Sequence, residues 1–208
     1  MTSLGITFRP ATAVDSDVLA DLVLGDAEQE TTRVQMRLFG LSDLEDRRLV
    51  IRLVWRAGEN WRQSTLAEVA GVPVGLVQVD HAGMKVTPQL VFALVGRLGP
   101  VAPFRIAWRL RLRPRVTVAI PPGAYEISEL HVSPAFRGRG IGEALLRFAE
   151  SDARERRFTT MALQTLTTNP AQKLYERNGF RTVAVRTDAQ FERITGAAGN
   201  VLMVRDLC

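Results

Sequence analysis

Residues 126–149 read EISELHVSPAFRGRGIGEALLRFA, and no other segment of the chain is as informative. A β-rich run leads into Arg-Gly-Arg-Gly-Ile-Gly at 137–142, and a helical pattern follows at once. A glycine-rich turn from strand to helix lets backbone N–H groups surround a phosphate, and the positive end of the helix faces the same anion. Arg137 and Arg139 add charge-assisted hydrogen bonds suited to phosphate oxygens. The stretch therefore predicts a diphosphate-binding turn.

Two common phosphate-binding motifs do not fit this turn. The dinucleotide fingerprint G-x-G-x-x-G fails because Gly142 follows Gly140 by only two residues. The P-loop fails because no Gly-Lys-Ser/Thr sequence occurs anywhere in the chain. The pattern that fits is Arg-x-x-Gly-x-Gly after a strand ending in Leu-x-Val-x-Pro. In this respect the segment resembles motif A of the GNAT superfamily, the acyl-CoA-dependent N-acyltransferases.

A second block, at residues 167–180, strengthens the resemblance. Taken alone it predicts a short capped helix, with Asn169 as the N-cap, Pro170 at the first helical position and Gly179 just past the end. It also resembles motif B of the same superfamily, N-x-x-A-x-x-x-Y-x-x-x-G-F, with the alanine one position earlier than usual. Two motifs in the family's order are far more specific than either alone.

The resemblance implies an α/β (α+β) architecture: the GNAT fold, a mixed and mostly antiparallel sheet of about six to seven strands flanked by helices. The sheet is expected to splay apart between the strands near 124–133 and 160–166, and acyl-CoA is expected to enter the gap. We expect further strands near 6–10, 61–69, 74–80, 180–187 and 199–206, and helices near 13–25, 27–39, 43–57, 140–156 and 170–178. One domain should cover residues 1–208, with a basic and apolar insertion at about 82–123.

The resemblance also implies the activity, an N-acetyltransferase that moves an acetyl group from acetyl-CoA to a primary amine by direct transfer in a ternary complex. The amine acceptor is a small molecule or a protein or peptide. The alternative is a non-catalytic acyl-CoA-binding sensor or interaction module. The positions implied in coenzyme binding are Leu130, His131, Val132, Arg137, Gly138, Arg139, Gly140, Gly142, Asn169, Ala171 and Tyr175.

Direct transfer needs an acid for the leaving thiolate and a base for the ammonium. By resemblance Tyr175 is the acid, and its ordinary pKa near 10 keeps it protonated. Glu126 is favoured as the base and Glu129 is second; strict alternation puts them on opposite faces of a strand, but the family's usual β-bulge removes that restriction. His131, or a base acting through ordered water, stays open as an alternative.

Composition excludes several other classes of protein. The chain has 208 residues, 46% of them hydrophobic and 24% charged, as in ordinary globular domains. We expect no metal site, because the two histidines and the single cysteine, Cys208, form no cluster in the sequence. We expect a cytoplasmic location, because no apolar run resembles a signal peptide or is long enough to span a bilayer.

The basic insertion is the least family-like part of the chain. Seven cations and no acidic residue lie between Asp80 and Glu126, and apolar residues are interleaved with them through 84–118. One interpretation is two short helices that cover the sheet or form a homodimer contact. Others are an apolar wall beside the acceptor, or a surface in weak contact with an anionic membrane. We expect no nucleic-acid partner, because aromatic and basic residues alternate too sparsely.

Overall fold

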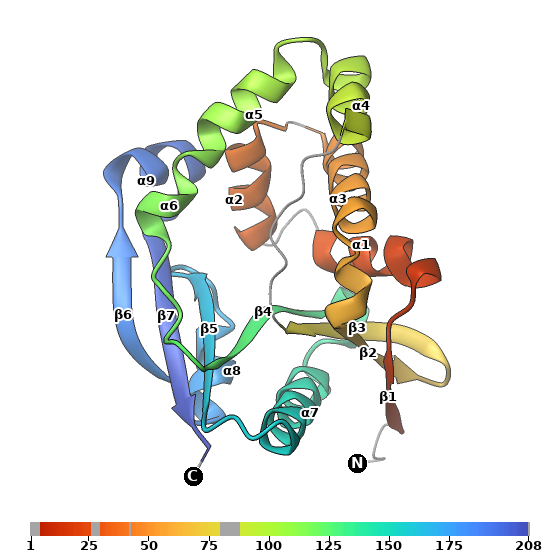
Figure 1. Cartoon of the computed structure of the whole chain (residues 1–208), viewed down its shortest axis with the longest axis vertical. Helices are drawn as coiled ribbons and strands as arrows, with labels where there is room; N and C mark the ends of the chain where they lie inside the picture. The colour runs from red at the N-terminus through yellow and green to blue at the C-terminus, as the bar shows by residue number, and fades with distance from the viewer. Residues whose placement is uncertain (1–4, 26–29, 42, 80–87, 208) are drawn as a thin grey trace.

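The computed structural model describes residues 5–25, 30–41, 43–79 and 88–207. Its centre is a sheet of seven strands in the order β1-β2-β3-β4-β5-β7-β6 (Figure 1). The strands are β1 (Ile6–Pro10), β2 (Ser64–Val69), β3 (Val72–Val79), β4 (Tyr125–Val132), β5 (Thr160–Leu166), β6 (Arg181–Thr187) and β7 (Gly199–Asp206). All neighbouring strands are antiparallel except β4 and β5. The expected mixed, mostly antiparallel sheet is confirmed.

Helices cover both faces of this sheet. They are α1 (Ser16–Leu24), α2 (Glu30–Phe39), α3 (Leu44–Gly58), α4 (Pro88–Leu98), α5 (Ala102–Leu110), α6 (Arg113–Val116), α7 (Ile141–Glu155), α8 (Gln172–Arg177) and α9 (Ala189–Thr195). Short 3-10 helices lie at Ala13–Asp15, Asn60–Gln63 and Pro134–Phe136. Neighbouring strand residues point to opposite faces: Leu76 packs with α1 and α3, whereas Val77 packs in the cluster that contains α7.

The parallel pair β4–β5 opens after three residue pairs. Tyr125, Glu126 and Ile127 pair with Met161, Ala162 and Leu163, and no pairing between these strands is present beyond that point in the described residues. β4 continues along β3 as far as Val132, whereas β5 continues along β7. The two strands therefore diverge, as expected for a sheet that splays in its middle (Figure 1).

Several element boundaries differ from the sequence-based expectations. Residues 61–63 belong to a 3-10 helix and not to a strand, and the β2–β3 turn is at Ala70–Gly71. α9 was not expected at all; it is a short helix capped by Asp188, whose side chain accepts a hydrogen bond from the Phe191 N–H. Asp80, Lys85 and the rest of 80–87 lie outside the described residues, so the start of the insertion is not described.

The described part of the insertion holds three helices, one more than in the interpretation of the insertion as two short helices. α4 and α5 pack on α2 and α3, with Leu94 and Ile106 buried against Val50. They therefore extend the helical layer away from the sheet (Figure 1). α6 packs instead with α9, through Val116 and Phe191. The segment after α6 returns over β5 and β7 to the start of β4.

Among the described residues, no helix taken alone has the length and apolar character needed to cross a bilayer. The segments Val91–Leu98 and Ala102–Val116 meet that requirement only as a pair, and the chain bends by 117° between them.

Candidate active site

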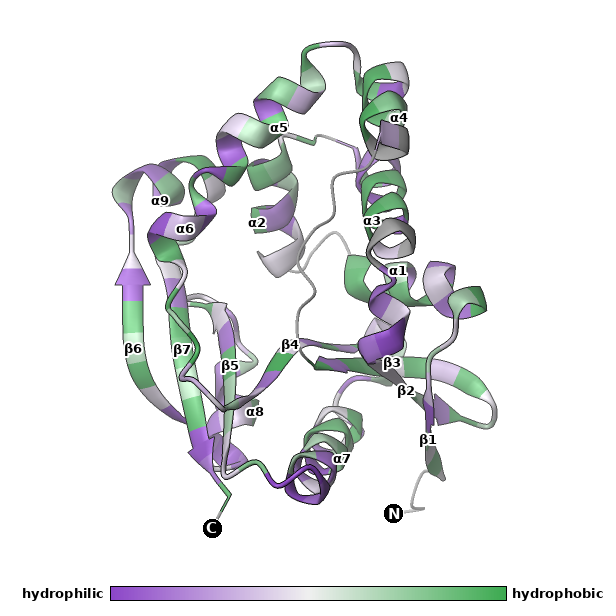
Figure 2. Ribbon diagram, viewed as in Figure 1, coloured by the Kyte–Doolittle hydropathy of each residue, from purple (hydrophilic) through white to green (hydrophobic). Residues whose placement is uncertain are grey.

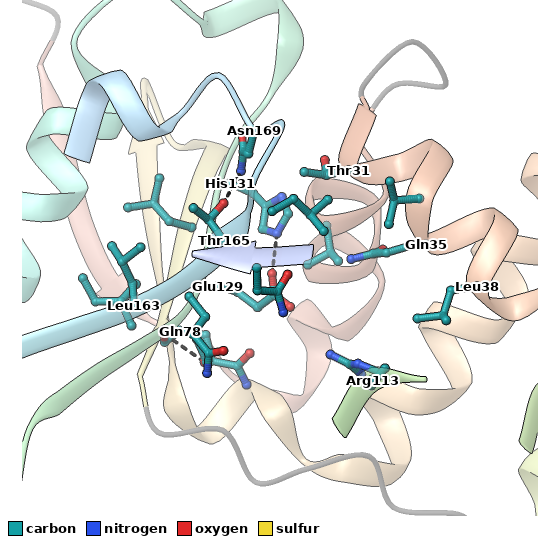
Figure 3. A pocket seen from close by; sticks show the side chains of 18 of the residues that line it. Thr31, Gln35, Leu38, Gln78, Arg113, Glu129, His131, Leu163, Thr165 and Asn169 are labelled. Atoms are coloured by element: carbon teal, nitrogen blue, oxygen red, sulfur yellow. Dashed lines mark hydrogen bonds and ion pairs between the residues drawn. The ribbon is translucent and has the colours of Figure 1, made fainter. Parts of the chain in front are cut away.

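A cavity of about 600 Å³ lies where β4 and β5 diverge. Its floor comes from β4 and β5, and its walls come from α1, α2, α3, α6, α8 and α9. Figure 3 shows the polar side chains that gather there, among them Gln35, Gln78, Arg113, Glu129 and Thr165. The cavity thus combines the open end of the strand pair with the first helices of the chain and the end of the insertion.

A β-bulge in β4 sets which side chains line this cavity. Gln78 pairs with Glu129 but the next residue, Val79, pairs with Ile127, so Ser128 is the extra residue. Before the bulge, Ile127 packs into the cluster that contains α7; after it, Leu130 packs against that same cluster. The alternation of β4 side chains between the two faces of the sheet is therefore shifted by one residue at Ser128.

This shift places both sequence-predicted glutamates at the cavity. Glu126 precedes the bulge and Glu129 follows it, and both line the cavity together with His131. Glu129 Oε2 lies 2.7 Å from His131 Nε2, and Figure 3 marks this contact. Glu126 lies where β4 still pairs with β5, at the closed end of the opening. Strict alternation would have separated the two carboxylates, and the bulge brings them together.

Tyr175 reaches the cavity from α8. Its side chain is buried, and its ring packs edge-on against Phe180 at 6.1 Å between centroids. Burial raises the pKa of the Tyr175 hydroxyl well above its ordinary value, and the negative charge of Glu129 raises it further. No hydrogen bond joins Tyr175 to a side chain in the described part of the chain. A protonated phenol that lines a cavity is suited to donate a proton to a bound group.

Asn169 shapes the loop between β5 and α8. Its amide Nδ2 donates to Thr165 Oγ1 at 2.6 Å, and its Oδ1 accepts from the Ala171 N–H at 3.0 Å. The prediction that Asn169 is the N-cap of the helix is wrong, because α8 begins at Gln172 and its N-cap is Ala171. The Asn169 side chain instead caps the turn at Pro170 and Ala171 that precedes the helix. Gly179 adopts the expected left-handed conformation after the helix, with φ of 82°.

The predicted diphosphate-binding turn leads into α7. Gly138 and Gly140 have φ of 71° and 81°, conformations that favour glycine, and a Cβ on either would meet no atom within 4 Å. The space beside the turn is therefore open, and the first N–H groups of α7 have no partner inside the helix. Gly142 differs, because its added Cβ would lie 3.0 Å from Leu174 Cδ2. Its small size serves the packing of α7 against α8.

Each of the two arginines of this turn contacts a residue close to it in the sequence. Arg137 Nε donates to the Val132 carbonyl at 3.2 Å, which ties the turn to the end of β4. The Arg139 guanidinium lies 5.3 Å from the centre of the Phe136 ring.

Sequence reasoning missed Arg47, which is buried behind the cavity wall and holds Gln35, a residue that lines the cavity. It is 1% exposed, and it donates to the Leu24 carbonyl at 2.6 Å and to Gln35 Oε1 at 2.7 Å. Burial lowers the pKa of Arg47 to about 10, opposed by the negative charge of Glu129. Arg47 thus joins α1, α2 and α3 beside the glutamate. Arg47 lies three positions before Val50 and four before Ile51, both buried, so its place on the apolar face of α3 was the sequence signal that could have identified it.

Arg113 and Gln78 were also missed as site residues. Arg113 belongs to α6 and brings a cation of the insertion to the cavity (Figure 3). Gln78 is fully buried on β3, opposite Glu129. Contacts between elements far apart in the sequence place both, so no local signal could have found them. Within the described ranges, no three His, Cys, Asp or Glu side chains cluster as a metal site requires.

The pKa of Tyr175 can be measured directly, because the chain has only two tyrosines. In a Tyr125→Phe background, the absorbance of the remaining phenolate at 295 nm should rise only well above pH 10. Replacing Glu129 by Gln in the same background should lower the midpoint, because one of the two causes of the raised pKa is removed. A midpoint near pH 10 in the Tyr125→Phe protein would contradict the conclusion that burial and the charge of Glu129 raise the pKa of Tyr175.

Comparison with known proteins agrees with this architecture. The profile of the acetyltransferase (GNAT) family matches residues 37–180. The N-alpha-acetyltransferase RimI of Mycobacterium tuberculosis is 38% identical over 78 residues, which cover 37% of this chain and 46% of that protein. This chain therefore spans less than half of that relative's length in the alignment.

Solved structures share the whole fold at low sequence identity. One is a histone acetyltransferase HPA2 and related acetyltransferase from Corynebacterium glutamicum, with a TM-score of 0.63, 19% identity, and coverage of 97% of this chain and 96% of that one. Another is the PaiA N-acetyltransferase of Thermoplasma acidophilum in complex with coenzyme A, with a TM-score of 0.56, 13% identity, and coverage of 97% and 99%. The splayed sheet, the two motifs and the match over residues 37–180 lead to one conclusion: the chain belongs to the acetyltransferase (GNAT) family.

Proposed function

We propose that this protein transfers the acetyl group of acetyl-CoA to a primary amine, directly and within a ternary complex. The observation that carries the proposal is the cavity at the β4–β5 opening. It brings two carboxylates, Glu126 and Glu129, together with the protonated hydroxyl of Tyr175. A base and an acid in one cavity are what direct acyl transfer to an ammonium group requires.

The coenzyme would bind along the open edge of β4 and at the turn that follows it. Beyond Ile127, β4 has no pairing with β5, so this edge is available for the pantetheine arm. The diphosphate would lie in the open space at Gly138 and Gly140, at the N-terminus of α7 and beside Arg137 and Arg139. Coenzyme A in the complex of the PaiA relative supports acetyl-CoA as the co-substrate.

The proton transfers follow from these positions. Glu126, or Glu129 in second place, would take a proton from the ammonium. The neutral nitrogen would then attack the thioester carbonyl carbon, and N–H groups on the open edge of β4 near Leu130 and Val132 would stabilise the oxyanion. The C–S bond breaks as Tyr175 donates its proton to the leaving thiolate. The second proton lost by the nitrogen restores Tyr175, so the products are an amide, free coenzyme A and a protonated base.

The acceptor is a primary amine on a small molecule, a peptide or a protein. Two carboxylates at the cavity favour a cationic amine, and Arg113 at its edge favours an acceptor that also carries a negative group. The name of the RimI relative, an N-alpha-acetyltransferase, supports an α-amino group. A cytoplasmic location, the lack of a nucleic-acid partner and a homodimer formed through an apolar surface stay predictions.

Thiol release from acetyl-CoA, measured with a panel of amines and peptides, tests the transferase. Tyr175→Phe should lower the turnover by roughly 10²–10⁴-fold, the usual contribution of a general acid. Tyr125→Phe is the matched control: this tyrosine is also buried, but its hydroxyl donates to Asp152 and does not line the cavity. Tight acetyl-CoA binding without release for any acceptor would favour the sensor alternative.

The pH dependence of turnover distinguishes the two carboxylates. Glu126→Gln should lower turnover most at low pH, where the acceptor is most fully protonated and a base is most needed. Glu129→Gln should cause the smaller loss at the same pH values. If Glu126→Gln has the pH–rate profile of the parent protein, Glu126 is not the general base. If only Glu129→Gln alters that profile, Glu129 is the base instead.

The diphosphate site can be tested with Gly140→Ala. The added methyl group strains a residue at φ of 81° and occupies the open space, so coenzyme A should bind roughly ten- to a hundredfold more weakly. Binding of acetyl-pantetheine, which lacks the diphosphate, should hardly change. Gly71→Ala is the matched control, with φ of 77° and equally open surroundings in the β2–β3 turn. If Gly140→Ala weakens the binding of coenzyme A and acetyl-pantetheine equally, the diphosphate does not bind at this turn.

A further inference from the structure

An outward-facing apolar stripe runs along α4 and α5. It consists of Val91, Phe92, Val95, Val101, Phe104 and Trp108. Phe92 and Phe104 are each 79% exposed and Trp108 is 53% exposed, and no other aromatic residue in the described part of the chain is among the exposed large hydrophobics. Single exposed apolar residues are ordinary, but six of them on two consecutive helices, three with aromatic rings, indicate an interaction surface.

The stripe is distinct from the face of these helices that packs on the protein. Ile106 of α5 and Leu94 of α4 are buried against α2 and α3. Val101, Phe104 and Trp108 are spaced by three and four positions, so they share the opposite side of α5. In Figure 2, α4 and α5 form the end of the molecule farthest from α7 and from both termini. The stripe is therefore accessible without unfolding any helix.

Cations accompany the stripe. Arg105 and Arg111 are exposed, and helical spacing places their Cα positions on either side of the stripe. The Arg105 side chain lies beside Gly40 at the end of α2, and neither arginine forms a hydrogen bond or ion pair within the described residues. The insertion brings no acidic residue, since none occurs between Asp80 and Glu126. The acids at the start of α3 are already engaged, because Asp46 pairs with Arg97 and Glu45 pairs with Arg48.

From this arrangement we infer that α4 and α5 dock on an anionic lipid bilayer. Aromatic and aliphatic side chains would enter the boundary between headgroups and acyl chains, and the flanking arginines would meet anionic headgroups at nearly the same depth. The helices would lie on the surface and not span it, because Leu94 and Ile106 hold them to α2 and α3 and the chain bends by 117° between them.

Charge argues against a second copy of the chain as the occupant. A two-fold contact would bring the same patch of both copies together. Arg105 and Arg111 of each would then face like charges across an apolar contact, with no acid of the insertion to neutralise them. An anionic bilayer complements the same cations and accommodates the same aromatic rings.

Vesicle cosedimentation with the full chain tests the inference, using pure phosphatidylcholine and mixtures with phosphatidylglycerol. We expect binding to the anionic vesicles that weakens with salt, and much less binding to the neutral ones. Phe92→Ser combined with Phe104→Ser should weaken binding at least roughly tenfold, because two exposed rings lose their burial in lipid. Val183→Ser with Val185→Ser is the control, since both residues are exposed apolar positions on β6. Thiol release should be unchanged in all these variants, which keeps this test separate from that of the transferase.

Tryptophan fluorescence supplies a second, local measurement. Trp108 is the exposed one of three tryptophans, so anionic vesicles should shift its emission to the blue and brominated lipids should quench it. Trp108→Phe should bind vesicles but lose this response. Equal binding to neutral and anionic vesicles, or no binding at all, would overturn the inference. So would dimerisation in free solution that Phe104→Ser abolishes, because the stripe would then be a contact between copies.

Discussion

The bulge at Ser128 is the local feature on which the arrangement of the site depends. One extra residue in β4 shifts the alternation, so that Ile127 and Leu130 pack toward α7 while Glu126 and Glu129 reach the opposite face. Bulges bend a strand and increase its twist. β4 leaves β5 at the same place, since their pairing ends at Ile127. The same segment of backbone therefore opens the sheet and aims the carboxylates into the opening.

Glu129 is the electrostatic centre of the cavity. It contacts His131, raises the pKa of Tyr175 and opposes the lowering of the pKa of Arg47. These three partners come from β4, α8 and α3, so the charge of one carboxylate is felt by elements far apart in the sequence. Arg47 in turn holds the C-terminal end of α1 through the Leu24 carbonyl and the middle of α2 through Gln35. The charge of Glu129 therefore acts on the buried Arg47, which links the helices of the cavity wall to the carboxylate of β4.

The insertion shows how a shared fold acquires its own surfaces. Its last helix, α6, brings Arg113 to the cavity, whereas α4 and α5 extend the layer formed by α2 and α3. The turn at 137–142 and the segment at 167–180 resemble motifs of the GNAT family, whose profile matches residues 37–180. The helices of the insertion lie outside those two motifs, and we expect the specificity of the protein to depend on them.

The sequence alone determined the elements whose signals are local. The sequence predicted β5 at 160–166 and β7 at 199–206 with the bounds that the structure has. The glycines and following amphipathic pattern of 137–156 predicted the turn and α7, and Gly179 predicted the end of α8, whose start lies two residues later than expected. Tertiary structure alone decided the rest. Strand pairing placed the bulge in β4, and the bulge put Glu126 and Glu129 on the same face of the sheet. Packing between helices far apart in the sequence buried Arg47 and brought Arg113 to the cavity. The same packing left Phe104 exposed. A periodic pattern shows that a helix has an apolar face, but only the neighbours that fold against it decide whether that face is covered.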